Sequence, residues 1–161
     1  MFVNSIHKLF QELTNYMNET MTGNLEKFSL IRKLNLPNAQ YAITGSGPLG
    51  IRNLKEIEDI DIIVTPELWN ILATKYGITD LNGVEKIVFP GGVIEAFREG
   101  SFYNAPGDDN APSIAESIAN AEIIDGLPFD SMENVLYYKR KGTREKDLKD
   151  IAIIEQWMRM Q

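Results

Sequence analysis

The sequence contains no cysteine and only one histidine, His7, among its 161 residues. Without cysteine, disulfide bonds, thiolate zinc sites and thiol nucleophiles are all excluded, and a reducing compartment such as the cytoplasm is favoured. A single histidine also excludes a metal site built from several imidazoles. Any metal that this protein binds must therefore be held by oxygen ligands.

Long apolar runs are missing as well. No stretch approaches the roughly 20 apolar residues that span a bilayer. The N-terminal segment, which includes Asn4, Ser5 and Lys8, is too polar for a signal sequence. We therefore expect a cytoplasmic protein with no membrane partner.

Positive charge is scarce in this chain. Lysine and arginine number 16 against 23 aspartates and glutamates, which gives a formal net charge of −7 and an isoelectric point near 4.8. A broad basic surface that grips long nucleic acid is therefore not expected. Residues 137–161 hold more basic than acidic side chains, so contacts to a small anion are expected near that end.

The composition, 43% apolar and 24% charged, is typical of a globular protein. We expect one domain over residues 1–161, with a helical lead-in at 1–37 and a helical end at 131–161. Between them, short β-prone segments and helical segments predict an α+β (or α/β) fold, a small mixed β-sheet flanked by helices. The expected strands are 41–44, 57–64, 85–89, 93–97 and 123–124, and the expected helices between them are 49–54, 66–77 and 114–119.

Two helices are expected in the lead-in. Apolar residues at helical spacing predict a first helix that ends near Thr22-Gly23 and a second that ends before Pro37. We expect His7, on the first helix, to be structural or exposed. The apolar stripes of both helices are expected to pack in the core. The first stripe consists of Ile6, Leu9, Phe10, Leu13 and Met17.

Two aspartates alternate with isoleucines in the second expected strand. Asp59 and Asp61 are two residues apart, so in a strand both carboxylates project from the same face. Adjacent carboxylates repel each other unless one is protonated or a cation lies between them. Because no histidine or cysteine is near in sequence, a hard divalent cation such as Mg²⁺ is the natural partner.

A glycine turn precedes this pair. Gly45-Ser46-Gly47 follows the expected strand 41–44 and leads into a short helix, where glycine allows the backbone N–H groups to approach an anion such as a phosphate. Two divalent cations would need a third carboxylate. Glu95 is the candidate, because it lies within an otherwise apolar strand.

Two basic residues are candidate phosphate contacts, Lys146 in the last expected helix and Arg52 after the glycine turn. The neighbouring Lys139, Arg144 and Lys149 are expected on a solvated helix face with ordinary salt bridges.

Gly45-Ser46, twelve intervening residues and then Asp59-Ile60-Asp61-Ile62 form a pattern that resembles the signature of the nucleotidyltransferase superfamily, the DNA polymerase beta-like group. That signature is glycine followed by glycine or serine, a gap of similar length, and an acid-hydrophobic-acid-hydrophobic run. The resemblance covers residues 41–64 well. The segment 144–151 also looks like the arginine-lysine-aspartate run that opens a closing helix in small bacterial or archaeal members.

The resemblance implies the transfer of a nucleoside monophosphate from a nucleoside triphosphate, such as ATP, to an acceptor hydroxyl, with two Mg²⁺ ions. In that scheme Asp59, Asp61 and Glu95 bind the metals, and Glu95 is also a candidate base for the acceptor. Ser46 and the backbone of Gly45 and Gly47 hold the triphosphate. Many members carry aspartate where this chain has Glu95.

Other functions are compatible with the same residues. The chain is small and has no recognisable acceptor domain, so the acceptor is expected to be a small molecule or a protein, and a partner protein would supply missing surface. One alternative is an inactive nucleotidyltransferase-like binding module, such as the antitoxin-type partner of a toxin–antitoxin pair or a nucleotide sensor. Another is an interaction protein whose carboxylates only keep a sheet face soluble.

Overall fold

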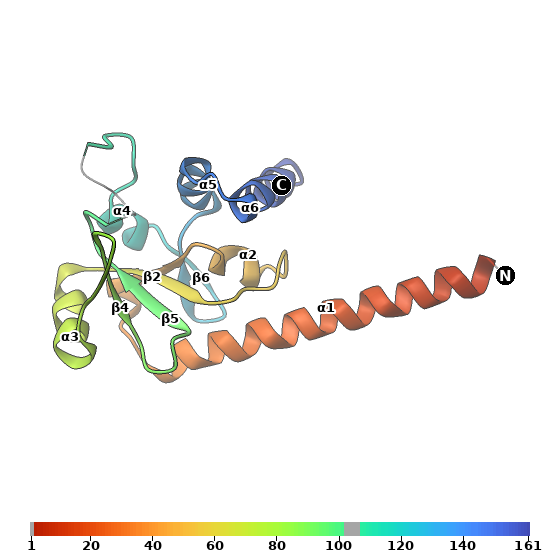
Figure 1. Ribbon diagram of the computed structural model, residues 1–161, viewed down its shortest axis with the longest axis horizontal. Helices are drawn as coiled ribbons and strands as arrows, with labels where there is room; N and C mark the ends of the chain where they lie inside the picture. The colour runs from red at the N-terminus through yellow and green to blue at the C-terminus, as the bar shows by residue number, and fades with distance from the viewer. Residues whose placement is uncertain (1, 102–106) are drawn as a thin grey trace.

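The computed structural model describes residues 2–101 and 107–161, without the side chains of residues 2–7, 17, 20 and 21. Within these residues the chain forms a mixed seven-stranded sheet of order β3-β4-β5-β2-β1-β7-β6, flanked by helices (Figure 1). This confirms the expected α+β class. The strands are β1 (Tyr41–Thr44), β2 (Ile60–Val64), β3 (Thr79–Leu81), β4 (Val84–Val88), β5 (Ile94–Phe97), β6 (Glu122–Ile124) and β7 (Leu127–Phe129).

The helices pack on both faces of this sheet. They are α1 (Phe2–Lys33), a short 3-10 helix (Asn38–Gln40), α2 (Gly47–Ile51), α3 (Pro66–Tyr76), α4 (Ile114–Ala119), α5 (Met132–Lys141) and α6 (Glu145–Arg159). Two strand pairs, β2–β5 and β1–β7, are parallel, and the other four neighbours are antiparallel. The parallel pair β2–β5 is the one that positions the candidate site.

Successive side chains of β2 point to opposite faces of the sheet. Ile60, Ile62 and Val64 belong to the larger core cluster, which also holds Phe28 of α1 and Leu68 of α3. On the opposite face, a second cluster joins sheet residues to α4 and α5; it consists of Ala42, Ile63, Phe97, Ile114, Ile118 and Tyr138. Ile60 and Ile62 point into the larger core. Asp61 lies between them in the strand and therefore projects toward the opposite face, the one that α4 and α5 cover.

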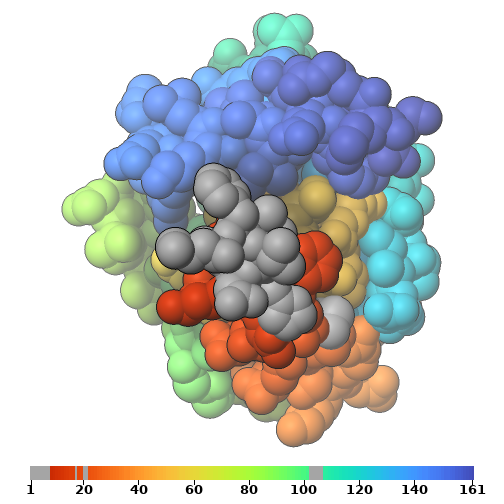
Figure 2. Space-filling view, turned by 90° about the vertical axis from the view of Figure 1, so that its right-hand side faces the viewer, coloured from red at the N-terminus to blue at the C-terminus, as the bar shows by residue number. Residues whose placement is uncertain are grey.

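The C-terminal helices cover the glycine turn. Leu49 of α2 packs in a third cluster with Met132 and Val135 of α5 and Ile154 of α6. Figure 2, which looks along α1, shows α5 and α6 in blue as one continuous surface across the top of the molecule. This packing brings the basic C-terminal segment to the end of β1.

The lead-in differs from the expected pair of helices. α1 runs without interruption for 32 residues, because a glycine inside a helix, here Gly23, costs only about 1 kcal/mol. It ends at Lys33, before Pro37 as expected, and Asn35 just beyond it adopts a positive φ of 48°.

We expected the apolar stripe of the first helix to pack in the core. This prediction is wrong for the three stripe residues whose side chains the structure describes, Leu9, Phe10 and Leu13. The N-terminal half of α1 projects beyond the sheet (Figure 1), and Leu9, Phe10 and Leu13 are 57%, 72% and 52% exposed. The side chains of Ile6, His7 and Met17 lie outside the described residues.

Across the described part of the chain, no helix has both the length and the apolar character that a membrane span requires.

Candidate metal and phosphate site

Three carboxylates singled out from the sequence lie together on the α4–α5 face. Asp59 directly precedes β2, Asp61 is the second residue of β2, and Glu95 is the second residue of β5. The parallel register places Asp61 beside Glu95. One carboxylate oxygen from each of the three residues lies within 4.8 Å of the others. Asp59 is exposed, and the other two are partly buried.

This spacing fits a hard divalent cation. Oxygen ligands at about 2.0–2.6 Å from one ion lie no more than about 5 Å from each other. All three donors are carboxylates, which Mg²⁺ and Ca²⁺ prefer. The three residues are therefore able to hold such an ion, as expected from a chain without cysteine and with a single histidine.

The turn after β1 passes very close to Asp61. Gly45 has φ +61°, and a Cβ at this position would lie 2.8 Å from Asp61 Oδ2. Both the positive φ and this contact favour glycine here, since a larger residue would be strained and would displace the Asp61 carboxylate. Gly47 is buried, and its added Cβ would meet Ile43 Cγ2 at 2.3 Å, so Gly47 serves helix packing and does not line the cleft.

Basic residues from α5 and α6 face the carboxylates across a cleft of about 310 Å³. Arg144 and Lys146 come from the start of α6, and Lys139 comes from α5. The cleft is lined by Thr44, Gly45, Ser46, Asp59, Asp61, Glu95, Phe97, Val135, Tyr138, Lys139, Gly142, Arg144, Lys146 and Asp147. The sheet side of the cleft thus carries three carboxylates, and the helix side carries three basic residues together with Asp147.

Two buried aspartates of α6 organise the basic wall. Asp147 accepts hydrogen bonds from Arg144 Nε at 2.7 Å and Nη2 at 2.9 Å, and these bonds hold the pKa of the Asp147 carboxyl below its usual value. Asp150 accepts from Lys55 Nζ and from Lys139 Nζ, each at 2.7 Å. Ser46 Oγ lies 3.5 Å from Asp150 Oδ2, which ties the glycine turn to the same aspartate.

This network corrects one expectation and adds residues that the sequence did not reveal. Lys139 was expected on a solvated helix face, but its side chain is only 12% exposed and bridges α5 to α6. Lys55, Asp147 and Asp150 were not expected in a site. For the two aspartates the sequence signals are their place in the run 144–151 and their three-residue spacing, which puts both on one side of a helix. Lys55 has no such signal.

Arg52 lies outside the cleft. Its guanidinium donates to Pro48 O at 2.9 Å, pairs with Glu122 and stacks 5.1 Å from the centre of the Trp157 ring. The structure therefore gathers Gly45, Ser46 and Lys146 around the carboxylates, but not Arg52 or Gly47.

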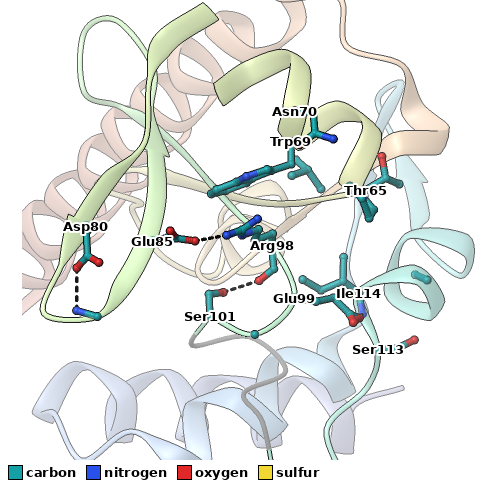
Figure 3. Close-up of a pocket in the computed structure, with 15 residues that line it drawn as sticks. Thr65, Trp69, Asn70, Asp80, Glu85, Arg98, Glu99, Ser101, Ser113 and Ile114 are labelled. Carbon is teal, nitrogen blue, oxygen red and sulfur yellow. Dashed lines mark hydrogen bonds and ion pairs between the residues drawn. The ribbon is translucent and has the colours of Figure 1, made fainter. Parts of the chain in front are cut away.

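A larger cavity, of about 850 Å³, lies at the other end of β2 and β5 (Figure 3). Its floor includes Trp69, and the Arg98 guanidinium lies 4.8 Å from the centre of that ring while pairing with Glu85. Glu99 accepts a hydrogen bond from the Ile114 N–H at 2.7 Å. Arg98 is thus paired with Glu85, and Glu99 binds the backbone of Ile114, so the charged groups of this cavity are engaged in structural contacts. In the smaller cleft, three carboxylates lie together on the sheet side.

A comparison of the chain with models of protein families, with curated proteins and with solved structures finds no match. The function must therefore be argued from the cleft itself.

Proposed function

We propose that this protein is a metal-dependent nucleotidyltransferase that transfers a nucleoside monophosphate from a nucleoside triphosphate to the hydroxyl of a small molecule or a protein. The observation that carries the proposal is the two-sided cleft, with three carboxylates on the sheet and three basic residues on α5 and α6. A magnesium–triphosphate complex presents the matching pair of charges, a dication and a polyanion.

Each wall has a separate task in this proposal. Asp59, Asp61 and Glu95 are the ligands for Mg²⁺, which when bound would offset the charge that develops on the α-phosphate and the leaving pyrophosphate. The backbone at Gly45 allows close approach of the phosphates, and Lys146 and Arg144 contribute positive charge to the opposite side. Glu95 is placed beside Asp61 and is the candidate to accept the acceptor's proton.

A second function is favoured by the projecting half of α1. The exposed stripe of Leu9, Phe10 and Leu13 is unusual for a surface helix of an isolated domain and offers contact area to a partner protein. We therefore keep the alternative of a nucleotidyltransferase-like binding module, such as a nucleotide sensor or an antitoxin-type partner. Magnesium-dependent turnover by the isolated chain would count against it.

The test of the leading proposal compares the full chain with Asp61→Asn, which keeps the size of the side chain and removes its charge. With α-labelled triphosphates, Mg²⁺ and a panel of acceptors, the native chain should transfer label, and Asp61→Asn should lower the rate by at least about a hundredfold. Asp109→Asn, at an exposed position outside the cleft, is the matched control. Equal rates for the native chain and Asp61→Asn would contradict the proposal.

A further inference from the structure

One lysine outside the lining of the cleft pairs with a carboxylate that lines it. Lys86, on β4, places its Nζ 2.7 Å from Glu95 Oε1, and each of the two side chains is only 19% exposed. The antiparallel register pairs Ile87 with Ala96 and Val88 with Glu95, so Lys86 reaches Glu95 diagonally from the neighbouring strand. An ion pair so far removed from water is stronger than a surface pair.

This ion pair involves one of the three carboxylates that fit a metal. Three carboxylates within 4.8 Å of one another repel, and the Lys86 ammonium offsets one of their three negative charges. A divalent cation that takes Glu95 as a ligand would lie close to this ammonium and be repelled by it. A metal bound to Glu95 would therefore have to share this carboxylate with Lys86 or displace it.

We propose that Lys86 is a built-in counter-ion of Glu95, a positioning residue that holds the third carboxylate when no metal is bound and lowers the affinity of the site for divalent cations. The inference rests on the metal site of the proposed function. A triphosphate brings negative charge into the cleft and offsets the repulsion between Lys86 and the metal. Lys86 thereby couples full metal occupancy to the arrival of the nucleotide.

The test titrates the full chain with Mn²⁺ alone, followed by electron paramagnetic resonance. Lys86→Met, which keeps a similar length without the charge, should bind Mn²⁺ about tenfold more tightly than the native chain. Lys86→Arg should retain native affinity, because it restores the ion pair. Lys75→Met, which removes the same charge from an exposed position of α3, should also leave the affinity unchanged.

Two further arms isolate the mechanism. In a Glu95→Gln background the gain from Lys86→Met should shrink, because the carboxylate for which lysine and metal compete is gone. With a non-hydrolysable nucleoside triphosphate present, the difference between the native chain and Lys86→Met should also shrink. Lys86→Gln repeats the measurement with a polar side chain, and circular dichroism checks that each variant is folded.

The outcomes separate this inference from the proposed function. If the native chain binds Mn²⁺ in a manner that Asp61→Asn abolishes, and both Lys86→Met and Lys86→Gln bind it no more tightly, the role of Lys86 is refuted and the metal site stands. If no variant binds Mn²⁺ in an Asp61-dependent manner, the metal site and the role of Lys86 are refuted together.

Discussion

Asp130 is a buried carboxyl that fastens the strand β1 to the start of α5. It accepts hydrogen bonds from Thr44 Oγ1 at 3.0 Å, from the Ser131 N–H at 2.9 Å and from Asn134 Nδ2 at 2.8 Å. Burial nevertheless raises the pKa of Asp130 above its usual value. Thr44 is also the register partner of Asp61 across β1 and β2. The hydrogen bonds of Asp130 therefore fix the strand residue beside Asp61.

The raised pKa predicts the effect of removing the charge. Because the folded protein holds the Asp130 proton more tightly than the unfolded chain does, stability falls as the pH rises from the unfolded pKa, about 3.9, through the folded one. Asp130→Asn should therefore keep or raise the free energy of unfolding at pH 7. Asp130→Ala leaves buried donors without an acceptor and should lower it by about 2 kcal/mol.

Urea denaturation of the native chain, Asp130→Asn and Asp130→Ala between pH 4 and pH 8 checks this prediction. The pH dependence that Asp130 contributes should be absent in both variants. An asparagine variant as unstable as the alanine variant would show that the negative charge itself stabilises the joint.

At the scale of elements, the turn between β1 and α2 sets the position of Asp61. Gly45→Ala should lower the free energy of unfolding by about 1–3 kcal/mol and weaken Mn²⁺ binding, because the added Cβ meets Asp61 Oδ2 at 2.8 Å on a backbone with φ +61°. Gly83→Ala is the matched control, since Gly83 also has a positive φ, 83°, but open space around it.

Both variants should lose some stability when measured by thermal denaturation, and only Gly45→Ala should lose metal affinity. If Gly83→Ala weakens Mn²⁺ binding to the same degree, the close approach of Gly45 to Asp61 does not control the site.

The elements that the sequence predicted are those specified by local patterns. Apolar alternation in β2 and the proline and glycine at the ends of α3 are readable within a few residues. By contrast, β7 is three residues long and contains Pro128, and it exists because it pairs with β1 far away in the chain. The exposed three-residue strand β3 likewise has no apolar pattern to reveal it.

The same distinction applies to the cleft. Asp59 and Asp61 are neighbours in sequence, so their pairing follows from the period of a strand. The basic wall is assembled by tertiary packing, since Ser46 and Asp150 are 104 residues apart and Lys55 and Asp150 are 95 apart. Burial of Lys139 could not be foreseen because it depends on how α5 meets α6, which no local pattern determines.

At the scale of the whole molecule, the net charge of −7 and a candidate anion site are compatible because charge is segregated. Three basic residues of α5 and the start of α6, Lys139, Arg144 and Lys146, line the cleft, and so does the cluster of three carboxylates on the sheet. Two divalent cations bound to that cluster would more than offset its three negative charges and so admit a triphosphate. The overall charge is therefore unfavourable for long nucleic acid and compatible with the proposed nucleotide.

The C-terminal end of α1 packs against the sheet, and its N-terminal half projects away from it (Figure 1). Phe28 is fully buried and meets the Phe129 ring edge-on at 5.5 Å, whereas Leu13 is 52% exposed on the same helix. Phe28→Ala should therefore lower the free energy of unfolding by about 3–5 kcal/mol. Leu13→Ala should change it by no more than about 0.5 kcal/mol, because the leucine side chain leaves no cavity in the core.

Urea denaturation at several protein concentrations measures both effects and also tests whether the projecting half of α1 is covered in solution. If the chain acts alone, the cost of Leu13→Ala stays small and independent of concentration. A larger cost that grows with protein concentration would mean that a second copy covers the stripe, since association stabilises the folded state by mass action. In that case the exposed stripe would be an interface of the assembled protein, and within the monomer α1 would contribute to stability mainly through its Phe28 end.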